Sequence, residues 1–507
     1  MTTLYRNGRV YGHPATALLV SDGRIGWIGD ETGAAGLAAD RTVELAGALV
    51  LPAFVDGHVH ATATGLALTG LDLTGLPSHS AVLLAIRAYA DTLPVSAVLL
   101  GHGWDESRWP ERRALTAADL DAAAGGRQVY LSRTDVHSAA VSTALLREID
   151  ADSAGFSSTG HLSVDAHHQA RAIAYASVTA AQRAGAQRAT RRHAASLGIA
   201  ALHECGGPAI AGEDDFTGLL RLAATEPGPL VTGYWGELRA ARKAVELGAH
   251  GAGGDLFADG ALGSHTAALA SPYVDSATKG HAYLSAVEIR DHVLGCVAAG
   301  VPAGFHAIGE AAVDTVLAGF HAATGQVGAA VIRAGRHRIE HAEMMSPAAI
   351  RLTAELGLTA SVQPAFDAAW GGPDGMYAER LGAERAATLN PFAGLHSAGV
   401  RLVFGSDSPV TPIDPWAGVR AAAAHRTSEH RLDWRTALDA HTRTGWECVG
   451  EPGGVLAVGA PAHLAMFETD DDPRTLVEFA AKAPTCLRTL VHGAEIFVRE
   501  GQVDPLP

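Results

Sequence analysis

Short, continuously apolar runs alternate with longer amphipathic stretches along most of the chain. Runs such as 301–305 and 400–404 have the length and apolar character of buried parallel strands. Stretches such as 286–299 and 347–356 carry apolar residues three to four positions apart, which is typical of helices that bury one face. The alternation therefore predicts an α/β protein.

The same pattern extends from residue 51 to residue 452. It predicts further strands over 128–131, 200–202, 230–232, 338–339 and 358–362. It predicts further helices over 80–93, 166–195, 236–247, 311–323 and 415–424. About eight such strand–helix units, with reactive side chains directly after the strands, favour a (β/α)₈ TIM-like barrel over an open sheet.

Both ends of the chain depart from this alternation. Short strands separated by turns are predicted over 17–20, 24–28 and 42–45, and again over 464–467 and 496–498. We therefore expect residues 1–50 and 453–507 to pair into one small β domain. Residues 51–452 would then form the barrel.

Charge and composition narrow the classes of partner. The chain has 38 Lys and Arg against 54 Asp and Glu, and a net charge of −16 argues against nucleic acid and anionic membranes. Four scattered cysteines indicate neither a disulfide framework nor a thiolate zinc site. No stretch approaches the roughly 18 apolar residues of a membrane span, and no apolar signal segment opens the sequence. We therefore expect a cytoplasmic protein.

Histidine is abundant, with 25 residues, and two of them form the most informative motif. Asp56-Gly57-His58-Val59-His60 directly follows the apolar run 48–55. Residues two positions apart in a strand point to the same face, so His58 and His60 would both point into the barrel. A divalent metal ion would give two buried imidazoles the partner that they need. The alternative is a pair of polar residues in a turn.

Three further residues occupy matching positions after predicted strands. His306 follows the run 301–305, His341 follows 338–340, and Asp407 follows 400–406. Barrel enzymes place their sites at the carboxyl ends of strands, and nitrogen and oxygen ligands suit zinc or another first-row divalent ion. Because such an ion lowers the pKa of bound water, Asp407 would be placed to accept the proton and return it to a leaving amine.

Several segments together resemble one enzyme family. They are 51–62, His203-Glu204, 257–269, His306-Ala307-Ile308-Gly309, 338–343 and Gly405-Ser406-Asp407. In combination they are similar to the amidohydrolase superfamily, and within it to the amidohydrolase-3 branch that includes N-substituted formamide deformylases. The resemblance extends from about Arg9 to Arg499. It implies a metal-bearing barrel, a small β-sandwich built from both termini, and hydrolysis of an amide-type C–N bond.

The resemblance also implies roles for the site residues. Carried over by position, His58, His60, His306 and His341 would be metal ligands, and Asp407 would be a ligand that doubles as the base. His341 could instead polarise the carbonyl group of the substrate. Gln363 and Trp370 are candidates for the wall of the substrate pocket or for packing, and Glu204 for a residue that orients a ligand.

The sequence departs from the family pattern at Asp255. In this branch the strand before the Phe257-Ala258-Asp259-Gly260 segment usually carries a Lys whose carbamate bridges two metal ions. Asp255 has the same sign of charge but a shorter reach, so three alternatives remain open: one ion, two ions drawn together around Asp255, or a weakened enzyme. We favour a single ion, because one is enough to activate water. A second departure is His265, where Arg is usual.

The sequence therefore predicts a metal-dependent hydrolase that cleaves an amide, formamide, carbamate or cyclic amide bond with one catalytic ion, zinc in the first place. The first alternative is a deaminase of an aminated heterocycle, which would need the same activated water and proton transfer. The second is a catalytically weakened barrel that binds a ligand without turnover. The expected partner is a small-molecule substrate, with neither nucleic acid nor membrane, and a homo-oligomer is compatible with the sequence.

Overall fold

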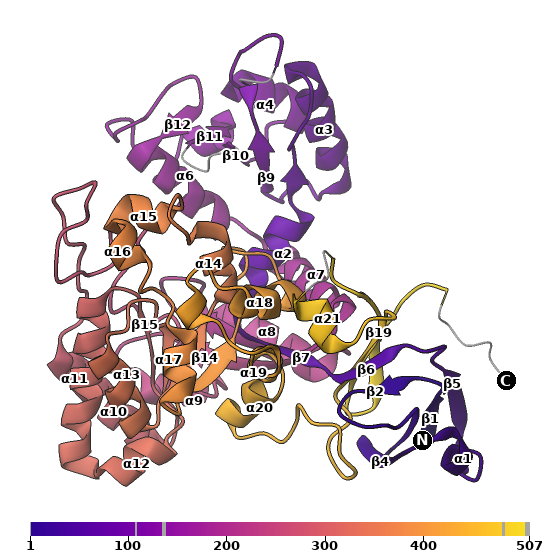
Figure 1. Cartoon of the computed structure of the whole chain (residues 1–507). Coiled ribbons are helices and arrows are strands. Elements are labelled where there is room, and N and C mark those ends of the chain that lie inside the picture. The colour runs from indigo at the N-terminus through magenta and orange to yellow at the C-terminus, as the bar shows by residue number, and fades with distance from the viewer. Residues whose placement is uncertain (1, 107–108, 134–137, 479–481, 502–507) are drawn as a thin grey trace. The chain divides into compact units, whose positions relative to one another are not determined.

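Figure 1 shows a computed structural model that describes residues 2–106, 109–133, 138–478 and 482–501. Contacts between residues divide the chain into two compact units. The first unit combines residues 1–60 with residues 191–507, and the second contains residues 61–190. The second unit falls within residues 51–452, which the sequence pattern predicted as one barrel.

The first unit contains two runs of parallel strands. In one run, β13 (Ile199–Gly206) pairs with β7 (Phe54–Val59) on one side and with β14 (Leu230–Trp235) on the other. The other run follows the order of the sequence and consists of β15 (Gly304–Ala307), β16 (Arg338–His341), β17 (Thr359–Val362) and β18 (Arg401–Phe404). The predicted α/β class is thus confirmed.

Isolated parallel bridges connect the two runs at both ends. Tyr234 pairs with Gly251 and Ala252 pairs with Ala303, so a short extended segment lies between β14 and the second run. Val59 pairs with Ser408, which joins the chain after β18 to β7.

Helices follow these strands along the chain (Figure 1). They are α8 (Glu213–Thr225), α9 (Ala241–Glu246), α10 (Ala286–Ala299), α11 (Glu310–Val327), α12 (Ala329–Ala334), α13 (Pro347–Leu356), α14 (Pro364–Trp370), α15 (Met376–Leu381), α16 (Ala383–Ala386), α17 (Phe392–Ser397), α18 (Pro415–Ala423), α19 (Trp434–Ala440) and α20 (Arg443–Val449). One large apolar core joins residues of the strands to residues of these helices.

Local signals explain why two of the helices begin and end as predicted. Ser285 and Glu288 form a reciprocal capping box at the start of α10, and Gly300 ends the helix in the left-handed conformation. Helix α13 begins with Pro347 in its first turn after the Ser346 cap. Both helices have the predicted bounds.

The two ends of the chain share a sheet. Strand β6 (Leu49–Pro52) pairs with β19 (Leu464–Glu468), and the sheet continues through β2 (Arg9–Val10), β20 (Thr485–Val491) and β21 (Ala494–Val498). A second sheet contains β1 (Thr2–Arg6), β3 (Ala17–Ser21), β4 (Arg24–Gly29) and β5 (Arg41–Glu44). A common apolar cluster includes residues of both sheets, among them Leu18, Val43, Leu464 and Leu490. Helices α1 (Glu31–Ala34) and α21 (Pro473–Glu478) lie in these terminal segments.

The second unit contains a five-stranded sheet of its own. The strands are β8 (Leu71–Asp72), β9 (Leu99–Trp104), β10 (Val129–Arg133), β11 (Ser138–Val141) and β12 (His161–Ser163). The helices are α2 (Ala61–Thr69), α3 (His79–Thr92), α4 (Ala117–Ala124), α5 (Thr143–Leu146) and α6 (Val164–Ala176), followed by α7 (Ala180–Ser196), which continues into the first unit.

Two predicted helices differ from those observed. The stretch 166–195 forms two helices, because Thr179 and Gln182 make reciprocal side-chain to backbone hydrogen bonds that start α7 anew. The stretch 236–247 is helical only over Ala241–Glu246, since Gly236 donates its N–H to the Gly206 carbonyl and stays in a loop. Within the described residues, no helix combines the length and apolar character needed to cross a membrane.

Candidate metal centre

Strand β7 carries the H-x-H motif into the interior of the first unit. His58 and His60 are both buried. Gly57 and Gly405 allow β7 and β18 to approach, because a Cβ on Gly57 would lie 2.3 Å from Val403 and one on Gly405 would lie 2.4 Å from the His58 nitrogen. The Asp56 carboxylate accepts the N–H of Ser406 at 2.9 Å and ties the loop after β18 to β7.

The loop after β18 brings Asp407 to the same place. The Asp407 N–H donates to the His58 carbonyl at 2.8 Å, and the His60 N–H donates to the Ser408 carbonyl at 3.0 Å. Asp407 has a φ of +52° and His341, at the end of β16, has a φ of +68°. Non-glycine residues rarely adopt this left-handed region, and such strain is concentrated at functional sites.

One nitrogen of each predicted histidine ligand is occupied by a hydrogen bond. Nδ1 of His58 bonds to Glu340 and Nδ1 of His341 bonds to Gln363, both at 2.9 Å. Nδ1 of His60 donates to the Cys205 carbonyl at 2.9 Å, whereas His306 uses Nε2 to donate to the Gly260 carbonyl at 3.1 Å. Such bonds fix the tautomer and the ring orientation of metal-binding histidines. The second nitrogen of each ring is left for a ligand.

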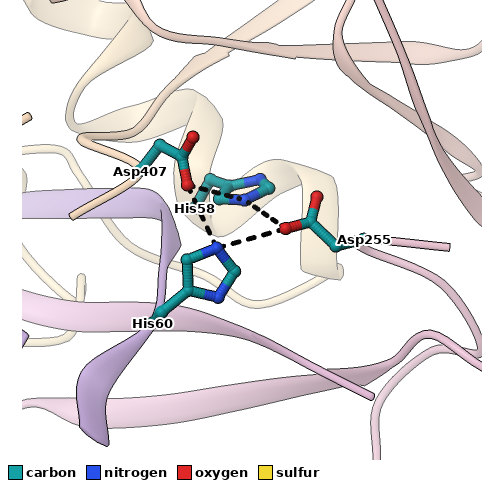
Figure 2. A group of neighbouring side chains, drawn as sticks. All are labelled: His58, His60, Asp255 and Asp407. Atoms are coloured by element: carbon teal, nitrogen blue, oxygen red, sulfur yellow. Dashed lines mark ion pairs between the residues drawn. The ribbon is translucent and has the colours of Figure 1, made fainter. Parts of the chain in front are cut away.

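Four of these side chains converge around one point, as Figure 2 shows. His60 Nε2 lies 3.1 Å from both Asp255 Oδ2 and Asp407 Oδ1. His58 Nε2 lies 3.5 Å from Asp255 Oδ2 and 3.4 Å from Asp407 Oδ1. These two nitrogens and two oxygens form a compact set of four atoms.

The other oxygen of Asp255 faces a second set. Asp255 Oδ1 lies 3.5 Å from His306 Nδ1 and 3.5 Å from His341 Nε2. Asp255 therefore belongs to two groups that each have metal-ligand chemistry, one oxygen in each. The six predicted site residues all lie in these two groups.

The arrangement fits metal ions better than direct hydrogen bonds. His58 Nε2, His306 Nδ1, His341 Nε2, Asp255 Oδ1 and Asp407 Oδ1 are buried and have no hydrogen-bond partner among the described residues. Ligands about 2.0–2.1 Å from a tetrahedral ion are roughly 3.3 Å apart, which the observed distances of 3.1–3.5 Å match. Buried polar atoms left without a partner are costly, so their convergence is typical of a cation-binding site.

The imidazoles and carboxylates of the cluster shift one another's pKa values. Burial lowers the pKa of His60, but the Asp255 and Asp407 carboxylates outweigh burial and raise it well above its usual value. Burial raises the pKa of Asp255, but the charge of His58 and the proximity of His306 and His341 hold it well below its usual range. The carboxylates are thus kept in the charged form that a metal ion requires.

Comparison with known proteins identifies the family. The chain matches the model of the amidohydrolase family over residues 41–497. It belongs to the amidohydrolase family. The predicted resemblance is therefore confirmed.

Individual relatives of this amidohydrolase agree with that assignment. It is 26% identical over 477 residues to amidohydrolase YtcJ of Bacillus subtilis (strain 168), covering 85% of each protein. It is 29% identical over 136 residues to N-substituted formamide deformylase of Arthrobacter pascens, or 26% of this chain and 25% of that protein. An uncharacterized metal-dependent hydrolase from Pyrococcus furiosus is 27% identical, with a TM-score of 0.79 over 94% of this chain and 100% of that one.

A buried ion pair in the amidohydrolase contacts Nδ1 of His58, the nitrogen that faces away from the other candidate ligands. Arg338 donates from Nε and Nη2 to the Glu340 carboxylate at 2.8 and 2.7 Å, and Glu340 in turn binds His58 Nδ1. Burial raises the pKa of Glu340, but the charge of Arg338 and the hydrogen bond from His58 lower it to about 2. Glu340 therefore remains a carboxylate that positions the His58 ring, and such a bond would make the other nitrogen a stronger metal ligand.

Sequence reasoning did not identify Arg338 and Glu340 as supporting residues. The signal that could have found them is the alternation Arg338-Ile339-Glu340, which places two charged side chains on one face of a buried strand. Gln363, a candidate for the pocket wall, accepts a hydrogen bond through Oε1 from His341 Nδ1. His265 lies 2.9 Å from the carboxylate of Asp275, which also pairs with Arg380, and all three side chains are partly exposed. His265 belongs to neither ligand group.

A third group with ligand chemistry combines Cys205 with His58 and Glu340. The His58–Glu340 contact is already a hydrogen bond of 2.9 Å. Burial raises the pKa of the Cys205 thiol, which disfavours the thiolate that a metal ion would need. We therefore interpret this group as part of the support for His58.

Glu340→Gln should weaken zinc binding by roughly 10–100-fold, because it removes the charge that orients and strengthens His58. Zinc affinity measured by chelator competition checks this, with circular dichroism as the test of folding. Since Arg338 would lose its ion-pair partner, the double variant Arg338→Met/Glu340→Gln should show the same loss without an unpaired buried cation. Glu343→Gln, a buried carboxylate beside Tyr377, is the control and should bind zinc normally. Unchanged affinity in both Glu340 variants would contradict the role of this pair.

Proposed function

We propose that this protein is a metal-dependent hydrolase that cleaves a C–N bond other than a peptide bond in a small-molecule substrate. The observation that carries the proposal is the convergence of unpartnered, buried nitrogen and oxygen atoms from five separate segments on one place. Family membership and the metal-dependent hydrolase of P. furiosus support it. An amide, formamide, carbamate or cyclic amide is the expected type of bond.

We also propose that the parallel strands of the first unit close into a (β/α)₈ barrel. The two runs of strands and the bridges at Gly251–Ala252 and at Ser408 are the pairings that a closed ring requires. The candidate ligands follow the carboxyl ends of the strands, where barrel enzymes bind substrates. The terminal segments 1–50 and 453–507 would form the small β-sandwich, and residues 61–190 would be an insertion after β7.

The metal is expected to be zinc, and we propose that two groups of residues, which share Asp255, would each hold one ion. The sequence alone favoured one ion, but each Asp255 oxygen faces a different pair of histidines. The set of His58, His60, Asp255 and Asp407 offers four protein ligands, which complete a tetrahedral site. The set of His306, His341 and Asp255 offers three, and three protein ligands with an open position are typical of catalytic zinc.

Bound metal would polarise the substrate carbonyl and lower the pKa of water in the site. The chain itself supplies the proton transfer. Asp407 directs Oδ1 at the two histidines of β7, and Figure 2 shows its second oxygen pointing away from them. We assign this second oxygen to accept a proton from water and to return it to the departing nitrogen.

Asp407→Asn keeps the shape of the side chain but removes its ability to accept a proton. We expect turnover to fall by about 10²–10⁴-fold while most of the metal is retained. Steady-state kinetics together with metal analysis check this result. Wild-type turnover in the variant would assign the base to another residue, and buried Glu204 would be tested next.

The function is tested with purified protein and a panel of N-acyl amines, formamides, carbamates and cyclic amides. We expect hydrolysis that a chelator abolishes and that added zinc restores. Aminated heterocycles serve as the comparison panel, with ammonia release as the readout. Turnover of the heterocycles alone would replace the proposal with a deaminase, and metal binding without turnover on either panel would identify a binding protein.

A further inference from the structure

A cavity of about 530 Å³ opens beside the candidate metal centre, and Asp255 forms part of its wall. The other lining residues come from the loops after β13 and β14, from segment 256–260, and from Tyr283. A volume of this size is within the range of small-molecule sites. Its position next to Asp255 makes it the place for the part of the substrate adjacent to the scissile bond.

The walls of this cavity are mainly apolar. Leu238, Leu256, Phe257 and Tyr283 contribute large hydrophobic side chains. The Phe257 ring packs on the ring of the candidate ligand His306, with ring centroids 4.7 Å apart. A substrate group that contacts Phe257 would therefore lie directly beside the reacting centre.

The charges that line the cavity are already paired. Apart from Asp255, Glu237 is the only acidic or basic residue among the described residues that line it. Glu237 Oε2 accepts the Trp235 indole N–H at 2.8 Å and lies 2.7 Å from Lys243 Nζ, which also pairs with Glu213. A cationic substrate would gain little from a carboxylate that is already bonded, and an anionic one would be repelled.

On the basis of the proposed function, we infer that the substrate carries an uncharged, apolar substituent next to the scissile C–N bond, and that this cavity binds it. No lining residue among those described carries the guanidinium or ammonium group that would recognise a substrate carboxylate. The inference therefore excludes N-acyl amino acids and similar anionic amides as preferred substrates.

Two matched substrate series test this inference with the metal-loaded protein. One varies the N-substituent of a formamide from methyl to butyl to 4-methylpentyl, and the other varies the acyl chain of an N-methylamide in the same way. In one of the two series kcat/KM should rise about two- to fourfold for each added methylene. N-(3-carboxypropyl)formamide has a carboxylate in place of the terminal isopropyl group of the 4-methylpentyl compound. This compound and the matching acyl compound should be poor substrates.

Two substitutions in the cavity wall test whether it determines the preference for apolar substrates. Leu238→Asp should lower kcat/KM for the longest apolar substrate by at least about tenfold more than it lowers kcat/KM for the methyl substrate. Because this side chain is partly buried, the half-exposed Tyr283 provides a second site. Tyr283→Arg should raise kcat/KM for the carboxylate substrate by about tenfold. Val274→Arg is the matched control. Val274 is exposed and lies in the same segment between α9 and α10 as Tyr283, but it does not line the cavity, so the variant adds the same charge outside the wall.

Binding measured without turnover separates the two proposals. Ligand-observed NMR on metal-free protein should detect the 4-methylpentyl compound and not its carboxylate analogue, with binding lost in Leu238→Asp. Selective binding without hydrolysis of any amide would contradict the proposed function and support the apolar cavity. Hydrolysis with no preference for chain length or charge would overturn this inference and leave the hydrolase assignment intact.

Discussion

Asp255→Ala is expected to reduce the bound metal from about two equivalents to about one and to reduce turnover below detection. Without Asp255 the second set keeps only His306 and His341, and two protein ligands do not hold a zinc ion firmly. The first set keeps His58, His60 and Asp407, which are enough to retain one ion. Metal analysis of protein purified in the presence of zinc, alongside amide hydrolysis, measures both effects.

The control for this variant is Asp367→Ala. Asp367 is also buried and pairs with His425 rather than with the candidate ligands. We expect it to keep both metal ions, so that a loss in Asp255→Ala cannot be assigned to the removal of any buried carboxylate. One equivalent of metal in the wild-type protein, with much of the activity left in Asp255→Ala, would instead support the single-ion site that the sequence favoured.

The bridge also predicts how the metal is loaded. An Asp carboxylate is present as soon as the chain folds, whereas a Lys needs carbon dioxide to form a carbamate. Wild-type protein should therefore take up both ions equally well in buffer free of carbon dioxide and in buffer with bicarbonate. Asp255→Lys should take up the second ion only with bicarbonate. Bicarbonate dependence in the wild type would contradict Asp255 as the bridge.

Replacing His58 and His60 together with Ala should remove the ion of the first set and abolish turnover. The two side chains supply half of the four ligand atoms, and Asp255 and Asp407 alone cannot complete a zinc site. Folding should be retained, because the apolar core is built from other residues. Metal analysis, kinetics and far-UV circular dichroism check these three expectations.

His203→Ala provides the matched control for that pair. His203 is buried on neighbouring β13 and accepts a hydrogen bond from Arg338 at 3.2 Å, but it belongs to neither ligand group. Its replacement should leave the metal content unchanged. Normal metal occupancy in the His58/His60 variant would refute the proposed site as a whole.

The local sequence was enough to predict many of the helices and strands and the common face of His58 and His60. Capping residues and the spacing of apolar positions gave α10 and α13 their bounds. The strand period placed His58 and His60 on one face, and the position of His306, His341 and Asp407 after strands predicted their common edge. These features depend on backbone geometry over a few residues, which the sequence specifies directly.

The position of Asp255 between the two groups of candidate ligands became visible only in the tertiary structure. From the sequence, one ion was favoured because one is enough to activate water, and the Asp255 side chain is shorter than a carboxylated Lys. In the fold, the backbone around Asp255 brings its two oxygens between two pairs of histidines, each 3.1–3.5 Å away. Whether a short side chain can bridge depends on the distance between strands, and local sequence does not contain that distance.

The residues that support the candidate ligands could be recognised only in the tertiary structure. The same holds for the separate unit of residues 61–190. His58 and Glu340 are 282 residues apart in the chain, and the Arg338–Glu340 pair contacts His58 only because the fold brings β16 close to β7. The sequence determined the α/β class and the candidate ligands, since these follow from local pattern, and the resemblance of its motifs predicted the family. The fold determined which nitrogen of each histidine is free and which carboxylate is shared, because both depend on contacts between segments that are distant in sequence.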